Sequence, residues 1–153
     1  MLHVIFFEPR IPGNTGAAIR LSACSGSQLH VVNPLFDMTD DTKLKRAGLD
    51  YHDLAHVCTH DSFNDALAAV PGRVWAFTGH ADTYHTDVTY ADGDGLLFGP
   101  EPTGLPPEIL NDTRLAGLVR IPMMPTVRSL NLANSASIGL YEAWRQLGFS
   151  GGV

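Results

Sequence analysis

The sequence predicts an α/β fold, with a mostly parallel sheet and helices on both of its faces. Three observations lead to this prediction. Short apolar runs rich in β-branched and aromatic residues, such as LHVIFF at 2–7, recur along the chain. Segments with helical spacing separate these runs, and turns rich in Gly, Pro or Asn follow them. Strands that alternate with helices in this way form parallel sheets.

The elements are expected in a regular order along the chain. The first strand stops at Glu8-Pro9, and a helix capped by Asn14 then runs to Gly26. Asp61 or Ser62 caps a later helix. Further strands are expected at 29–32, 73–78, 95–98 and 118–121, and further helices at 39–47, 61–70 and 130–147.

The composition is that of one compact domain over residues 1–153. Hydrophobic residues make up 44% of the chain and its mean hydropathy is +0.02, which suits a folded domain with a core. Cys24 and Cys58 are too few for a disulfide framework, and both are expected to be reduced, mostly buried thiols. The N-terminus lacks a basic leader, and no run reaches the roughly 20 apolar residues of a membrane span. We therefore expect a cytoplasmic protein.

The net charge of −6 weighs against a strongly anionic partner such as RNA. Ten Lys and Arg residues face sixteen Asp and Glu residues, so binding to RNA requires that the cations cluster. Three cations lie in KLKR at 43–46, Arg10 and Arg20 flank one loop, and Arg120 and Arg128 flank another. The alternative is that these cations do not cluster but are scattered over the surface and solvated.

Three loops after expected strands can carry chemistry, because ligands of α/β domains usually bind at the carboxyl ends of strands. The sequence has no GxGxxG after its first strand and no GxxxxGK[ST], which disfavours dinucleotide binding and P-loop chemistry. The loops are PGNTG at 12–16, FGPEPTGLP at 98–106 and IPMMPTVRSLNLAN at 121–134. Each one alone is also typical of an ordinary turn or helix cap.

In this order and at these spacings, the three loops closely resemble the three motifs of the SPOUT methyltransferases. The resemblance is closest to the tRNA 2′-O-methyltransferases that modify the wobble nucleotide, and it extends to LKRAGLDYH at 44–52 and NLANSASIGLYEAWRQLG at 131–148. It implies a deep trefoil knot near the C-terminus, an exception to the rule that chains do not thread loops. It also implies S-adenosylmethionine as the cofactor and a homodimer whose active sites are completed across the interface.

The activity that the resemblance implies is 2′-O-ribose methylation of nucleotide 34 of tRNA, a cytidine or a modified uridine, with the anticodon stem-loop as the RNA partner. Two alternatives stay open: methylation of another tRNA or ribosomal RNA position, and a knotted RNA-binding module without turnover. The joint presence of five polar residues argues against the second alternative, because a non-catalytic relative needs no such set. These expected catalytic residues are Asn14, Arg20, Glu101, Ser129 and Asn131.

The resemblance also assigns the residues that hold the cofactor. They are Thr78, Gly79, Gly99, Pro100, Glu101, Gly104, Ile121, Met123, Ser129 and Leu130. Similar enzymes often have Glu-Thr-Arg-Gly in the second motif, where this chain has Glu-Pro-Thr-Gly at 101–104. A cation is therefore missing from that loop, at Thr103.

The chemistry of methyl transfer agrees with these roles. Gly99 and Gly104 let the backbone approach a flat adenine or ribose, and the prolines of the same loop stiffen it. Transfer to a ribose hydroxyl is an in-line displacement, so positioning and a cation near the oxygen dominate. Arg20 fits that cation, while a phosphate or water takes the proton, because a guanidinium with a pKa above about 12 gives one up reluctantly. Asn14 can hold Arg20 or the ribose, and Glu101 can accept a hydrogen bond from either.

Four other side chains have the spacing of a metal site only superficially. They are His52, His56 and His60, with Cys58 between them. No carboxylate is fixed nearby, so we expect a structural or surface role and no metal. The polar stretch at 84–90 is expected to be a mobile surface loop.

The helix at 130–147 predicts the homodimer in its own right. It has more apolar surface than one sheet face can cover, and small residues allow a second helix to approach closely. The apolar set is Leu130, Leu132, Ala133, Ala136, Ile138, Leu140, Ala143 and Leu147. Tyr141 and Trp144 are expected in the core or at the interface, and a charge at Ala136 is expected to separate the subunits.

Overall fold

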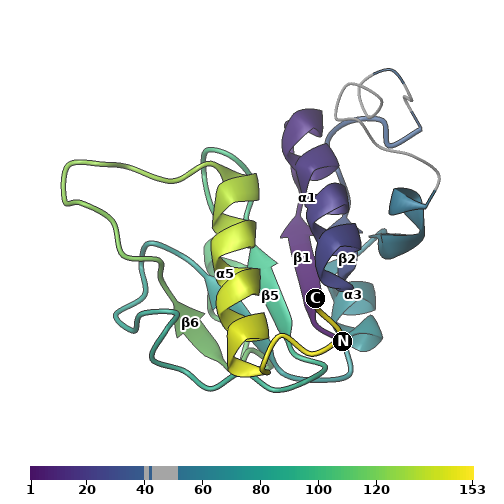
Figure 1. Cartoon of the computed structure of the whole chain (residues 1–153). Coiled ribbons are helices and arrows are strands. Elements are labelled where there is room, and N and C mark those ends of the chain that lie inside the picture. The colour runs from purple at the N-terminus through teal and green to yellow at the C-terminus, as the bar shows by residue number, and fades with distance from the viewer. Residues whose placement is uncertain (40–41, 43–51) are drawn as a thin grey trace.

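Figure 1 shows a computed structural model of the chain, in which residues 1–39, 42 and 52–153 are described. Within these residues, six parallel strands form a sheet in the order β3-β2-β1-β5-β4-β6. The strands are β1 (His3–Phe7), β2 (Gln28–Val32), β3 (Val57–His60), β4 (Val74–Phe77), β5 (Gly95–Phe98) and β6 (Gly117–Val119). The predicted parallel sheet is confirmed, whereas the knot stays a prediction. The helix predicted at 39–47 lies almost entirely outside the described residues.

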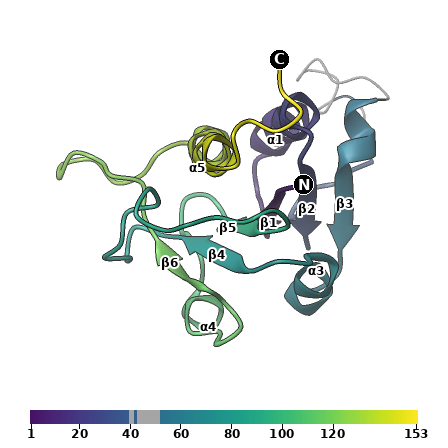
Figure 2. The ribbon, with the colours of Figure 1, turned by 60° about the horizontal axis from the view of Figure 1, so that its bottom comes forward.

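Helices cover both faces of this sheet, as predicted. Two of them, α1 (Pro12–Ser25) and α5 (Leu132–Gln146), pack side by side on one face. The shorter α3 (Phe63–Ala69) and α4 (Pro107–Leu110) lie on the other face (Figure 2), and a 3-10 turn η1 (Asp53–His56) precedes β3. None of the described helices is long and apolar enough to cross a membrane.

The core has one layer on each face of the sheet. Val4 and Phe6 of β1 pack in the layer beneath α1 and α5, whereas Ile5 between them packs in the layer beneath α3. All three side chains are fully buried. Residues 4–7 of this strand are therefore apolar at consecutive rather than alternate positions, as expected for a parallel strand covered on both faces.

Helix α5 packs closely on the ends of β4 and β5. The rings of Phe77 and Phe98 stack with their centroids 4.6 Å apart, and a Cβ on Gly139 would lie 2.9 Å from the Phe77 ring. Ala136 and Leu140 are fully buried within their own chain. The prediction that these residues form a subunit interface is therefore wrong, and a charge at Ala136 would disrupt the core.

The helix ends agree with the predicted capping, with one exception. Gly26 ends α1 with a φ of 69°, and the Ser62 hydroxyl accepts a hydrogen bond from the Asp65 N–H to cap α3. Helix α1 begins earlier than predicted, at Pro12, because proline at the first helical position has no N–H that needs a partner. Asn14 is therefore not the cap, and its side chain makes the contacts described below.

The prediction that both cysteines are buried is wrong. Cys24 and Cys58 are both exposed, and Cys58 lies on the edge strand β3. The stretch at 84–90 lies mostly at the surface, as predicted, but two of its side chains are buried: the Tyr90 hydroxyl donates to the carbonyl of the buried His85 at 2.6 Å. The backbone N–H of Tyr90 donates to the side-chain oxygen of Gln146 on α5 at 2.9 Å.

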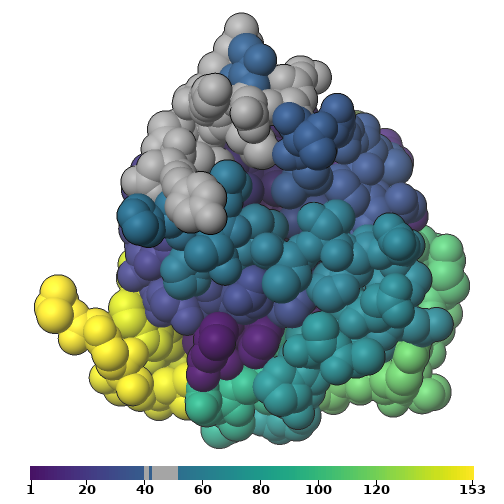
Figure 3. All heavy atoms as spheres, turned by 90° about the vertical axis from the view of Figure 1, so that its right-hand side faces the viewer, coloured from purple at the N-terminus to yellow at the C-terminus, as the bar shows by residue number. Residues whose placement is uncertain are grey.

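Helix α5 also anchors the C-terminal tail, which projects from the body (yellow in Figure 3). The Trp144 ring contacts Tyr141 and Phe149 edge-on, and its N–H donates to the Ser150 carbonyl at 3.0 Å. Trp144 packs against the core, as predicted, whereas the Tyr141 side chain is 43% exposed.

Three histidine rings form a hydrogen-bonded row across β1, β2 and β3. His3 Nδ1 lies 2.9 Å from His30 Nε2, and His30 Nδ1 lies 2.8 Å from His60 Nε2. Burial lowers the pKa of His30 to about 4, with further contributions from His3 and His60. Of the residues with superficial metal spacing, His60 joins this row and His56 Nδ1 contacts the Ser27 carbonyl at 3.2 Å.

We expect this row to make the stability depend on pH. The fold keeps His30 neutral down to about pH 4, whereas an unfolded histidine takes up a proton near pH 6.5. The unfolded state therefore binds more protons between these values, and the free energy of unfolding should fall by about 3 kcal/mol as the pH drops from 6.5 to 4. Urea unfolding at several pH values measures this slope, which His30→Gln should flatten. The exposed His80→Gln is the matched control, and an unchanged slope in His30→Gln would contradict the prediction.

Candidate active site

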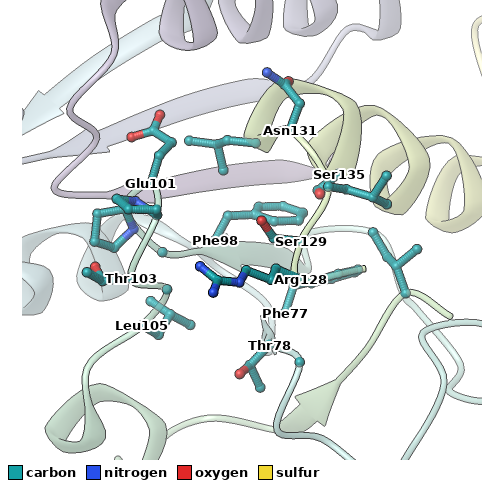
Figure 4. Close-up of a pocket in the computed structure, with 18 of the residues that line it drawn as sticks. Phe77, Thr78, Phe98, Glu101, Thr103, Leu105, Arg128, Ser129, Asn131 and Ser135 are labelled. Carbon is teal, nitrogen blue, oxygen red and sulfur yellow. The ribbon is translucent and has the colours of Figure 1, made fainter. Parts of the chain in front are cut away.

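The loops that follow β1, β4, β5 and β6 enclose a pocket of about 550 Å³ at the carboxyl edge of the sheet (Figure 4). Pockets of this size hold small ligands. The pocket lies beside the junction of β1 and β5, where the strand order reverses, which is the usual ligand position in α/β sheets. All predicted site residues except Arg20 line it, namely Asn14, Thr78, Gly79, Gly99, Pro100, Glu101, Gly104, Ile121, Met123, Ser129, Leu130 and Asn131.

A chain of hydrogen bonds joins three parts of this pocket. Glu101 accepts from the N–H of Arg10 at 2.9 Å and from the side-chain amide of Asn14 at 3.1 Å. The side-chain oxygen of Asn14 in turn accepts from the side-chain amide of Asn131 at 2.9 Å. The side-chain oxygen of Asn131 caps α5 by accepting from the Asn134 N–H at 3.1 Å. The first loop, the second loop and the start of α5 are therefore fixed to one another.

The second loop depends on two glycines. The Gly104 N–H donates to the Pro100 carbonyl at 2.8 Å, and Gly104 has a φ of +72°, which favours glycine. A Cβ on Gly99 would lie 2.2 Å from the backbone nitrogen of Leu105. The prediction that Gly99 leaves space for the ligand therefore needs correction, because the loop itself occupies that space.

The third loop, between β6 and α5, projects from the body in Figures 1 and 2. Its residues 124–131 are all exposed. Arg128 and Ser129 nevertheless line the pocket, and Figure 4 shows the Arg128 guanidinium extending toward Thr103 and Leu105 of the second loop. The pocket is thus walled on this side by an exposed segment.

Arg20 lies outside the pocket of its own chain. It is on α1, two turns beyond Asn14, and its guanidinium lies 3.2 Å from a carboxylate oxygen of Asp53 in η1. Asp53 is nearly buried, so the ion pair holds Arg20 against η1. The predicted contact from Asn14 is absent among the described hydrogen bonds, since the Asn14 side chain bonds to Glu101 and Asn131.

Sequence reasoning missed several lining residues. Phe77 and Phe98 give the pocket an apolar side, but in the sequence they are typical of strand core. Arg128 could have been found, because it stands next to Ser129 in the third motif. The other residues that were not predicted are Ile11, His80, Pro102, Thr103, Leu105, Leu132 and Ser135. No cluster of described residues could hold a metal ion.

A pocket built by these three loops at the carboxyl edge of a parallel sheet is the arrangement that the motifs predict for a methyltransferase. The chain belongs to the SpoU rRNA Methylase family, whose model matches residues 1–141. It is 47% identical to the tRNA (cytidine(34)-2'-O)-methyltransferase of Escherichia coli (strain K12), over 100% of this chain and 98% of that protein.

Solved structures are similar as well. One, described as "Structural insights into the 2-OH methylation of C/U34 on tRNA", has a TM-score of 0.87 and 43% identity, and covers 97% of both chains. Another is the SpoU methyltransferase AviRb from Streptomyces viridochromogenes in complex with AdoMet, with a TM-score of 0.82 and 30% identity. The match covers 96% of this chain and 60% of AviRb.

Proposed function

We propose that this chain transfers a methyl group from S-adenosylmethionine to the 2′-hydroxyl of nucleotide 34 of tRNA, a cytidine or a modified uridine. The observation that carries the proposal is the full-length similarity to a relative named for this reaction. The meeting of all three motifs around one pocket supports it. We further propose that the chain acts as one domain, in the cytoplasm, on the anticodon stem-loop.

The pocket suits S-adenosylmethionine in shape and in charge. The rings of Phe77 and Phe98 offer an apolar side to an adenine, and the backbone of 99–104 lies where a flat ligand can approach it. Glu101 places a carboxylate on the pocket wall, which suits a positively charged ligand. The cofactor supplies an electrophilic methyl group on a positively charged sulfur. Thr78, Gly79 and the third loop would close the remaining sides.

A second copy of the chain would complete the site. Arg20 does not line the pocket of its own chain, and its guanidinium is paired with Asp53. Ile138 and Tyr141 of α5 leave apolar surface exposed on the face where α1 and α5 lie together. A two-fold pair would cover this surface and could bring Arg20 of one subunit to the pocket of the other. The homodimer therefore explains why one catalytic residue lies apart from the rest.

In this dimer the residues of the chain position and polarise the ribose. The guanidinium of Arg20 would stabilise negative charge that develops on the 2′-oxygen. A phosphate or water would take the proton, because a guanidinium is a poor base. Asn14, Asn131 and Ser129 present amide and hydroxyl groups that can orient the ribose.

The experiment is methylation of tRNA transcripts by the purified protein with labelled S-adenosylmethionine, followed by nuclease mapping of the labelled nucleotide. We expect the label at nucleotide 34. A transcript with a 2′-deoxy nucleotide at that position is the control and should stay unlabelled. Label at another tRNA position or in ribosomal RNA would replace the proposed substrate, and no label in any RNA would refute the activity.

A further inference from the structure

Arg128 is the one strong base among the described residues that line the pocket. The structure gives its side chain no hydrogen bond or ion pair with any described residue, whereas Arg20, Arg73, Arg114 and Arg145 each contact a carboxylate. Its guanidinium extends from the third loop toward Thr103 and Leu105 across the pocket (Figure 4). A cation is thus aimed into the space where a ligand would lie.

The acid of the pocket, Glu101, is not paired with Arg128 in the described contacts. Glu101 accepts hydrogen bonds from Arg10 N–H and from Asn14, on the side of α1. The neighbours of the Arg128 guanidinium, Thr103 and Leu105, carry no charge. An exposed guanidinium in a wall of this kind can bind an anion that enters with the ligand, and its planar fork matches a carboxylate in two parallel hydrogen bonds.

We propose that Arg128 binds the carboxylate of the methionine part of S-adenosylmethionine. The cofactor carries one carboxylate, together with a positive sulfonium and a positive amino group. Arg128 on one wall and Glu101 on another therefore match the two signs of charge at that end of the molecule. An RNA phosphate fits less well, because the guanidinium extends between the second and third loops into the pocket rather than outward from the projecting segment.

The inference rests on the proposed cofactor site and is tested with two ligands that differ in one group. S-adenosylmethionine and its decarboxylated form share the adenosine, the sulfonium and the amine. Calorimetry with Arg128→Ala should show about tenfold to hundredfold weaker binding of S-adenosylmethionine, the range for a charged hydrogen-bonded pair. Binding of the decarboxylated form should change by less than about twofold. Arg128→Lys should weaken the binding of S-adenosylmethionine less than Arg128→Ala does, because lysine keeps the positive charge. It should still bind more weakly than the wild type, because lysine lacks the planar fork.

Arg145→Gln is the matched control. It removes one positive charge near the far end of α5, roughly 15 Å by helix rise from Ser135, which lines the pocket. Equal losses for both ligands in Arg128→Ala, or no loss for either, would overturn the inference. A weaker apparent affinity for tRNA with unchanged cofactor binding would overturn it in favour of a phosphate contact. If the wild type binds neither ligand, the cofactor site itself fails, which separates this result from failure of Arg128 alone.

Discussion

Replacing Arg20 by alanine is expected to slow methyl transfer at least about a hundredfold, the scale for losing one group that stabilises charge in the transition state. The affinity for S-adenosylmethionine should stay within a few-fold, because Arg20 does not line the pocket of its own chain. Arg20→Lys should restore little activity, since lysine lacks the planar fork. Single-turnover kinetics and calorimetry measure the two effects. A wild-type rate in Arg20→Ala would show that Arg20 only ties α1 to η1.

Co-expressed variants test whether the site is shared between subunits. A mixed dimer of Arg20→Ala and Gly99→Ala chains has one pocket that is intact and receives an intact Arg20. Random pairing makes about half of the dimers mixed, and one of the two sites in each mixed dimer is intact. About a quarter of all sites in the mixture should therefore be active. The rates are compared at a concentration of S-adenosylmethionine far below the Kd of Gly99→Ala, so that its weakened pocket stays empty. If each chain held a complete site, the mixture would then be as inactive as its components.

Gly99→Ala is expected to weaken cofactor binding about tenfold to hundredfold, the cost of forcing one extra carbon into a packed position. The new Cβ would lie 2.2 Å from the Leu105 nitrogen and 2.4 Å from the Gly104 carbonyl carbon. Both atoms are backbone and cannot rotate away, so the second loop must move. Calorimetry on the folded variant measures the loss.

Gly13→Ala is the control for that variant. A Cβ on Gly13 meets no atom within 4 Å, and the residue lies in the first turn of α1. Alanine favours a helix there, so stability should be kept or slightly raised. Wild-type binding by Gly99→Ala would remove the second loop from the cofactor site.

The sheet could be predicted from the sequence because its strands are short, apolar and followed by turns. The strand at 57–60 was not predicted: it is an edge strand, and its residues VCTH are partly or fully exposed. The row of histidines was not predicted either, since His3, His30 and His60 come from three strands and meet only through the register of the sheet. Local pattern cannot supply such pairings.

The candidate site was predictable where it depends on loop composition. Gly99, Gly104 and Asn131 stand in motifs whose order in the chain indicates a common pocket. The partners of each polar group were harder to predict, because Asn14 bonds to Glu101, 87 residues away, and Arg20 pairs with Asp53. These contacts depend on how the helices are placed on the sheet.

The hydrogen bonds among Asn14, Glu101 and Asn131 also bear on the order in which the protein is made. A ribosome delivers the N-terminal part of a chain first, and contacts between distant residues form only when both partners have emerged. Asn131 lies 117 residues after Asn14, so the pocket cannot be assembled until α5 follows. A nascent chain that already contains the whole of β1–β5 therefore has the sheet centre but no complete binding site.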